Sequence, residues 1–270
     1  MFCIRFFRYV SHVVLFAAFA TTGYGGDFDH THSNWNAVLS QYLDQDGLVA
    51  YKSLKEDLNQ KKTAHSFENY LASLQKVSKR DYDAWSKNDQ KAFLINAYNA
   101  FTIKLIVDHY PVESIKDIGG FLTKPWDVEF FSLLGGAIKS IDPIEHDFLR
   151  PKFEDYRIHA AVNCASISCP PLRRHAFVGK LLDSQLDEQM QIWLLDRGRN
   201  RFDATTGEAR ISKIFDWYEK DFEKWGGGVK GVLLKHGDDQ VKEAVKSSKK
   251  FRYLDYDWNL NESKSSVKGT

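Results

Sequence analysis

The sequence is poor in the features that usually reveal a function directly. Its 270 residues include only three cysteines and two methionines, and its 37 basic side chains are balanced by 36 acidic ones. Such a balance gives no electrostatic footprint for nucleic acid or for an acidic membrane. A glycine-rich phosphate loop, a dinucleotide fingerprint, HExxH and GxSxG are also missing. We therefore expect no nucleic-acid partner, no cofactor and no metal.

The composition is that of a folded globular protein. Hydrophobic residues make up 43% of the chain and aromatic residues 14%. A chain of this size can bury roughly 70 to 75% of its unfolded surface, so it needs neither a metal nor a disulfide merely to fold. No repeat, low-complexity tract or linker divides the chain, which favours one domain.

The N-terminus has the pattern of a secretory signal peptide. Two arginines precede an apolar run from Val13 to Ala20, and small residues suited to cleavage follow. We expect residues 1–25 to be a signal peptide, the mature chain to begin between Thr21 and Asp27, and the protein to be exported, either periplasmic or secreted. The segment is short for a membrane span, so we expect no stable membrane insertion after its removal; an uncleaved anchor is the alternative.

The rest of the chain predicts an α+β fold, with a central buried helix and further helices packed on a small, largely antiparallel sheet. We divide it into a helical N-terminal layer at 26–88, a core at 89–261 and a tail at 262–270. Apolar spacing of three and four residues predicts helices at 34–44, 67–78, 184–196 and 213–225. Strand-like patterns occur at 127–134, 157–163 and 251–258, and a hairpin is predicted around 203–210.

The most informative helix is predicted between Asp89 and Tyr110, where Pro111 ends it. Its apolar residues point all round the axis, so we expect this helix to be buried at the centre of the protein. Asn96 and Asn99 are three residues apart and share one stripe of the helix. Buried amides must be satisfied, so these side chains either tie down neighbouring loop backbone or line a site.

Candidates for chemistry crowd into residues 144–172. Their polar side chains include Glu145, His146, Arg150, Arg157, His159 and Asn163. If 157–163 is a strand, alternation places its arginine, histidine and asparagine on one face, where a cleft would give them partners. We therefore expect the side chains of His159, Asn163 and Asn99 to converge on one cavity.

Signal-peptide removal leaves two cysteines, Cys164 and Cys169, in an oxidising compartment. Three interpretations remain open. The pair forms a disulfide, or one thiol is a nucleophile activated by His159 or His146, or the pair binds a metal together with these histidines. The spacing is poor for a metal site. As a nucleophile Cys169 is favoured, because it lies in a loop, whereas Cys164 ends the apolar face of the predicted strand.

Several segments resemble, in order, the motifs of one known family. They are FLINAYNAFTIKLIVDHYPVESI, SIDPIEHDFLRP, RIHAAVNCASISCPPL, SKIFDWYEKDF and YLDYDWNLN. Between Asp89 and Asn261 the chain is similar to the bacterial and plant family called domain of unknown function 547 (DUF547), and it looks like an exported bacterial member. The resemblance implies that polar motif positions form a site: Asn96, Tyr98, Asn99, Glu145, His146, Arg150, His159, Cys164 and Cys169. The family name assigns no function.

Two hypotheses for the function follow. The first is thiol-dependent acyl chemistry, either hydrolysis or transfer, on a peptide-like or amide substrate. Cys169 would attack, His159 would act as the base, and Glu145 or Asn163 would orient that histidine. Backbone amides of the loop that follows Cys164 would hold the oxyanion.

The second hypothesis is a non-catalytic module that binds a small-molecule, peptide or protein ligand and carries a disulfide between Cys164 and Cys169. Arg150 and Arg157 would then grip a carboxylate of the ligand. The other candidate ligand-binding residues are Asn96, Asn99, His146 and Asn163. Counting free thiols would separate the two hypotheses.

Overall fold

The structure is a computed structural model that describes residues 28–60, 65–120 and 123–264. The predicted signal peptide and its cleavage site lie outside the described residues, and so does most of the predicted tail. Within the described ranges, no helix combines the length and the apolar character needed to cross a membrane.

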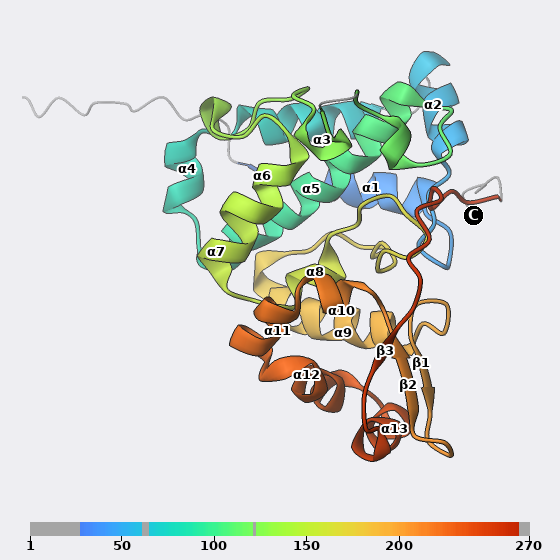
Figure 1. Cartoon of the computed structure of the whole chain (residues 1–270). Coiled ribbons are helices and arrows are strands. Elements are labelled where there is room, and N and C mark those ends of the chain that lie inside the picture. The colour runs from blue at the N-terminus through green and yellow to red at the C-terminus, as the bar shows by residue number, and fades with distance from the viewer. Residues whose placement is uncertain (1–27, 61–64, 121–122, 265–270) are drawn as a thin grey trace, which may run out of the picture.

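The chain is mainly helical (Figure 1). Its first part comprises α1 (Ser33–Tyr42), α2 (Tyr51–Gln60), α3 (His65–Lys76), α4 (Lys79–Ala84), α5 (Lys87–His109), η1 (Ile115–Asp117), η2 (Pro125–Asp127), η3 (Leu134–Gly136), α6 (Ile141–Pro143), the π-helical turn η4 (Ile144–Leu149), and α7 (Arg150–Phe153). The second part comprises α8 (Ile158–Ala161), η5 (Gly179–Leu181), α9 (Leu182–Leu195), β1 (Arg201–Asp203), β2 (Glu208–Ile211), α10 (Ile214–Trp217), α11 (Glu219–Gly226), α12 (Gly228–His236), α13 (Asp239–Ser247) and β3 (Arg252–Tyr253).

These elements form two lobes that meet around α8 (Figure 1). The N-terminal lobe contains α1 to α7, and the C-terminal lobe contains α9 to α13 and the sheet. Each lobe has its own apolar core, the first packed around α5 and the second built mainly from α9 to α13. Helix α8 belongs to both, because Ile158 and Ala161 join the first core and Ala160 joins the second.

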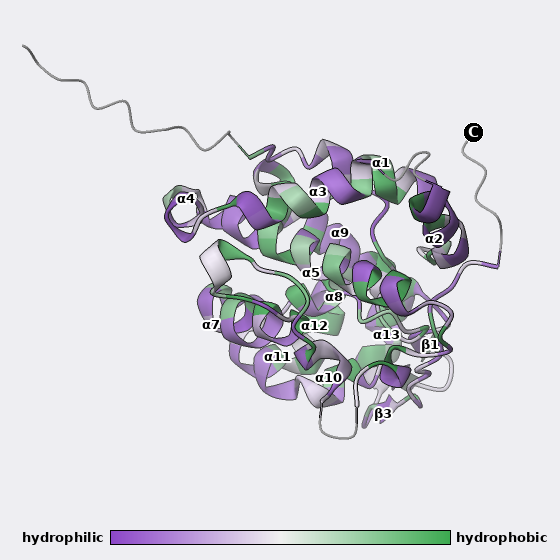
Figure 2. Cartoon of the chain, turned by 90° about the horizontal axis from the view of Figure 1, so that it is seen from above, coloured by the Kyte–Doolittle hydropathy of each residue, from purple (hydrophilic) through white to green (hydrophobic). Residues whose placement is uncertain are grey.

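Helix α5 is the central buried helix that the sequence predicts. Ser86 caps it by accepting a hydrogen bond from the backbone N–H of Asp89 at 3.1 Å. From Gln90 to Val107 every residue except Lys104 is buried. The neighbouring helix α3 alternates polar and apolar residues (Figure 2), as expected of a helix with one face in the core and one in water.

The sheet is small and mixed. β1 and β2 form the predicted hairpin, antiparallel with Phe202 opposite Ala209, and Gly207 turns the chain with φ +67°. β3 pairs parallel with β2, with Arg210 opposite Arg252. The α+β class is therefore confirmed, and the sheet combines one antiparallel and one parallel pairing.

Three of the strand predictions need correction. Residues 157–163 contain helix α8 in place of a strand, 127–134 form no named strand, and only the two residues of β3 pair within 251–258. The alternation of polar and apolar residues in 157–163 wrongly indicates a strand. Ile158 and Ala160 lie on one helical turn, and each packs in a different apolar core. Burial on two sides produces the same sequence pattern as burial on one face of a strand.

The segment after β3 ties the two lobes together. It runs from the sheet along the molecule to the N-terminal lobe (Figure 1). There the N–H of Val49 donates to the carbonyl of Asn261 at 2.9 Å, and the N–H of Asn261 donates to the carbonyl of Ala165 at 3.1 Å. The Tyr51 hydroxyl donates to Asn261 Oδ1 at 2.8 Å. This segment therefore links the loop after α8 to residues 49–51 at the start of α2.

Replacing Asn96 by leucine should destabilise the protein, although leucine is apolar. The Asn96 side chain donates to the Phe177 carbonyl at 2.7 Å and accepts from the Phe177 N–H at 3.0 Å. Asn96→Leu would leave both buried backbone groups unpaired and should lower the free energy of unfolding by about 1 to 3 kcal/mol in urea titrations. Lys87→Leu, at an exposed position of the same helix, should change it by less than about 0.5 kcal/mol. Equal stabilities of the two variants would contradict this role of Asn96.

Candidate binding pocket between the lobes

A cavity of about 300 Å³ opens where the two lobes meet, and we call it the junction pocket. Its aromatic lining residues are Tyr98, Trp126, Trp217, Tyr218, Tyr256 and Trp258. Its other lining residues are Asp142, Glu145, His146, His159, Val162, Cys164, Cys169 and Ile214. The volume lies at the small end of the range for ligand pockets, which suits a compact ligand.

Six of the eleven predicted site residues reach this pocket. They are Tyr98, Glu145, His146, His159, Cys164 and Cys169. Arg150 does not line the pocket itself but contacts a lining residue: its Nη1 is 2.8 Å from His146 Nδ1. The structure does not bring the remaining candidates to the lining, and these are Asn96, Asn99, Arg157 and Asn163.

Asp221, which the sequence analysis did not single out, organises the polar side of the pocket from α11. Its Oδ2 accepts a hydrogen bond from His159 Nε2 at 2.9 Å. Arg150 donates to the same carboxylate through Nε at 2.6 Å and Nη2 at 3.1 Å. Burial alone would raise the pKa of the Asp221 carboxyl, but hydrogen bonds from His159 and Arg150 hold that pKa well below its usual range. Asp221 is therefore ionised, and it fixes the orientation of the His159 ring.

Two buried polar atoms in the pocket make no hydrogen bond within the described part of the chain: Glu145 Oε1 and His159 Nδ1. They are 3.9 Å apart, and their residues are only 6% and 2% exposed. Burial raises the pKa of the Tyr98 and Tyr218 hydroxyls, and the charge of Glu145 and hydrogen bonding to its carboxylate raise it further. Both hydroxyls therefore stay protonated beside the carboxylate, while Oε1 itself has no hydrogen-bond partner among the described residues.

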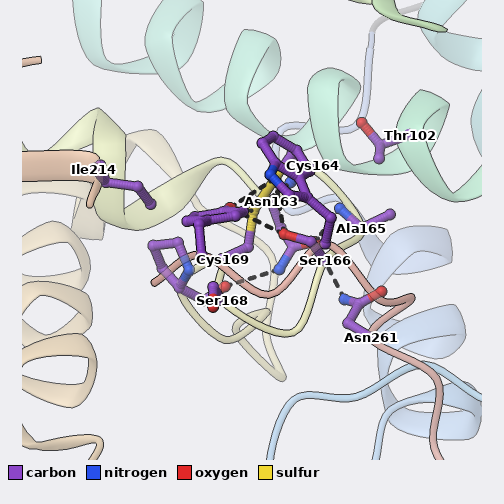
Figure 3. Close-up of a disulfide and its surroundings, with 12 residues drawn as sticks. Thr102, Asn163, Cys164, Ala165, Ser166, Ser168, Cys169, Ile214 and Asn261 are labelled. Atoms are coloured by element: carbon purple, nitrogen blue, oxygen red, sulfur yellow. Dashed lines mark hydrogen bonds between the residues drawn. A yellow bond between two sulfur atoms is a disulfide. The ribbon is translucent and has the colours of Figure 1, made fainter. Parts of the chain in front are cut away.

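A disulfide joins Cys164 and Cys169 in the loop after α8 (Figure 3). The Tyr256 hydroxyl lies 3.1 Å from Cys164 Sγ and 3.2 Å from Cys169 Sγ. Cys169 is buried and Cys164 is half-buried, so the residue favoured as a nucleophile is the less accessible of the two. Of the three interpretations of this pair, the structure contains the disulfide, which leaves neither sulfur as a thiolate.

Asn163 holds the disulfide loop in its conformation (Figure 3). Its Nδ2 donates to the carbonyl of Pro170 at 2.8 Å. Its Oδ1 accepts from the N–H of Ala165 at 2.8 Å and from Asn261 Nδ2 at 3.2 Å. One side chain therefore links the two ends of the loop to the C-terminal segment.

Asn99 supports the same loop from α5. Its Nδ2 donates to the carbonyl of Ala161 at 2.9 Å, and its Oδ1 accepts from the N–H of Asn163 at 2.8 Å. Asn99 thus ties down loop backbone, which is one of the two roles that the sequence leaves open for it. Of the three side chains expected to converge on one cavity, only that of His159 lines the junction pocket.

Arg157 takes part in a separate network of ion pairs. It donates to Asp155 Oδ1 and Oδ2 at 2.9 Å each, and to Asp183 and Asp187 at 2.8 and 2.9 Å. Lys91 Nζ donates to Asp155 Oδ2 at 2.8 Å. Burial would raise the pKa of the Asp155 carboxyl, but Arg157 and Lys91 lower it to about 2. Arg157 therefore has acidic partners of its own.

The fold and the pocket define a class: an α+β protein with a disulfide and aromatic rings around a small cavity that holds a few polar groups. Residues 82–194 match the model of the family described as "Protein of unknown function, DUF547". The chain belongs to that family over this segment, which includes both cysteines, Glu145 and His159. Asp221 and Tyr256 lie beyond the matched residues. No curated protein and no solved structure matches the chain.

The Asp155 ion pairs should make the free energy of unfolding depend on pH in the acidic range. The pKa of Asp155 is lowered from 3.8 to about 2 in the folded state, so its contribution is complete above about pH 4 and disappears as the pH falls towards 2. This shift corresponds to about 2 kcal/mol. In urea titrations at pH 7, the free energy of unfolding of Asp155→Asn should be well below that of wild type. The difference between the two should be smaller at pH 3.

Asp183→Asn is the matched control for that measurement. This substitution removes an exposed carboxylate that pairs with the same arginine, Arg157. It should lower the free energy of unfolding by less than about 1 kcal/mol. A gap between wild type and Asp155→Asn that does not change with pH would contradict the assignment.

Proposed function

We propose that this chain is an exported protein that binds a small molecule or a peptide-like group in the junction pocket. The observation that carries the proposal is the pair of buried, unpaired polar atoms, Glu145 Oε1 and His159 Nδ1, in a cavity walled by aromatic rings. A buried polar group without a partner costs about 1 to 3 kcal/mol. A ligand that pairs with both atoms would recover this cost, and the aromatic rings would supply apolar contact.

Export is part of the proposal. The charged and apolar pattern of residues 1–25 supports it, although that segment lies outside the described residues. The disulfide between Cys164 and Cys169 also supports it, because such bonds persist in the periplasm or outside the cell and are rare in the cytosol. The balance of charge favours a ligand other than nucleic acid.

Binding is favoured over acyl chemistry for two reasons. The disulfide removes the nucleophile from the resting protein. The loop amides expected to hold an oxyanion are also largely occupied: the N–H groups of Ala165, Ile167, Ser168 and Cys169 donate to Asn163 Oδ1 and to the carbonyls of Asn259, Asp257 and Ser166. An oxyanion would have to displace these bonds.

Thiol-dependent hydrolysis or acyl transfer is the second candidate, and one observation favours it. His159 is oriented by Asp221 in the same pocket that both cysteines line. After an external dithiol reduces the disulfide and is itself oxidised, the Cys169 thiol would give its proton to His159 and attack the carbonyl carbon of an amide. The C–N bond would then break, the amine would leave with the proton from His159, and water or another acceptor would release the acyl group from Cys169. In this version Asp221 replaces Glu145 or Asn163 as the residue that orients the base.

Thiol labelling should separate the two candidates. In protein purified from an oxidising compartment, iodoacetamide should label neither Cys164 nor Cys169, and reduction in denaturant should release both thiols. Peptide mass mapping makes the measurement site by site. Rapid labelling of native Cys169, slowed in His159→Ala, would instead favour the thiol enzyme.

A pocket-filling variant tests the binding proposal itself. A library of small fragments should contain molecules that raise the melting temperature of wild type but not of Val162→Phe, because Val162 lines the pocket. Val229→Phe, the same change at a buried position outside the lining, should keep the response. If both variants respond to every fragment as wild type does, the junction pocket is not the binding site.

A further inference from the structure

We propose that the ligand of the junction pocket carries a protonated primary amine or amidine, whose N–H groups bind Glu145 and His159. This inference rests on the proposed binding function and adds the chemical class of the ligand. Three properties of the pocket support it: the hydrogen-bonding character of its unpaired atoms, the charges around them, and the rings of its wall.

Both unpaired atoms are acceptors when His159 is neutral. Asp221 is ionised and can only accept, so the hydrogen of His159 lies on Nε2, 2.9 Å from Asp221 Oδ2. Nδ1 of the neutral ring then offers a lone pair, and Glu145 Oε1 offers another. With the two atoms 3.9 Å apart, one nitrogen bearing two or more hydrogens could donate to both.

The charge of the pocket favours a cation. Arg150 is engaged by Asp221 through two hydrogen bonds, so its charge is matched there. Within the described residues no lysine or arginine forms an ion pair with Glu145, whose nearest basic atom is His159 Nδ1 at 3.9 Å. At the rim, Asp142 adds a second carboxylate, with His146 Nε2 3.5 Å away. Arg150 acts on Glu145 only at a longer range: burial would lower the pKa of Arg150, but Asp221 and the more distant charge of Glu145 raise it. A cationic ligand would supply a counter-charge in direct contact with Glu145.

The aromatic wall also attracts cations through the negative faces of its rings. Trp217, Tyr256 and Trp258 form a cluster with ring centroids 4.5 to 5.8 Å apart. Two of the lining rings already have cations of the chain against them: Lys116 Nζ lies 3.7 Å from the Trp258 centroid, and Arg150 Cζ lies 4.9 Å from that of Tyr218.

A matched series of probes separates charge from hydrogen bonding. Benzylamine is a cation with N–H groups, benzyltrimethylammonium is a cation without them, and benzyl alcohol is neutral. Titration at pH 7.5 can be followed by tryptophan fluorescence, because Trp126, Trp217 and Trp258 line the pocket. We expect benzylamine to bind about tenfold or more tightly than either of the other probes, as charge-assisted hydrogen bonds require.

Glu145→Gln should weaken benzylamine binding about tenfold or more and leave benzyl alcohol nearly unchanged, because it removes the charge while keeping the shape of the side chain. Asp147→Asn is the matched control: it removes the same charge two residues away, at an exposed position outside the lining, and should leave binding unchanged. The melting temperature of each variant without probe shows whether it is folded. If Glu145→Gln fails to fold, the three probes on wild type still test whether the pocket prefers a cation with N–H groups.

Several results would overturn the inference. Equal affinity for benzyl alcohol and benzylamine would point to a neutral ligand, and equal affinity for benzyltrimethylammonium would exclude the role of the N–H groups. Failure of all three probes, while other fragments still bind in a Val162-dependent way, would overturn the amine class and keep the pocket. Failure of every fragment as well would overturn the proposed function.

Discussion

The carboxylate of Asp221 is the interaction on which the geometry of the junction pocket depends. It lies on α11 in the C-terminal lobe and binds Arg150 of α7 and His159 of α8. One buried charge thus joins the lobes, compensates an arginine and selects the tautomer of the histidine. Removing one partner of such a buried cluster typically costs about 3 to 5 kcal/mol, since the remaining charges stay buried.

The part of the wall that carries the disulfide is fixed by neutral groups. Asn99 and Asn163 hold the loop after α8 by hydrogen bonds to its backbone, and the disulfide closes that loop. The C-terminal segment then packs Tyr256 against both sulfurs. A wall held at so many points loses little conformational freedom when a ligand binds, so a small pocket of this kind can retain affinity that a mobile loop would lose.

Secondary structure is easiest to predict from the sequence where a whole helix or strand lies in one kind of surroundings, such as the apolar core. Helix α5 is predictable because it is apolar all round, and Asn96 stands out as a polar exception on it. Helix α8 is not, because its single turn lies between two cores and carries too few residues to show a helical period. Asp221 could not be found from periodicity, since an acid on an amphipathic helix looks like a surface charge. The signal for it is the family-like segment SKIFDWYEKDF, in which it lies.

The unpaired atoms of Glu145 and His159 make sense as a compromise between stability and binding. An apolar residue of similar shape at Glu145 would remove the buried carboxylate, and replacing buried charges by well-packed apolar groups is often neutral or stabilising. The fold instead keeps the acid at 6% exposure, while the buried amides of Asn96, Asn99 and Asn163 are hydrogen-bonded. Other buried polar atoms of the described residues also lack a partner, among them Tyr82 Oη, Gln189 Oε1 and Trp193 Nε1, but these lie outside the pocket lining. Glu145 and His159 differ from them because their open atoms lie side by side in one cavity, which is the pattern expected when binding, and not folding, sets the identity of the side chain.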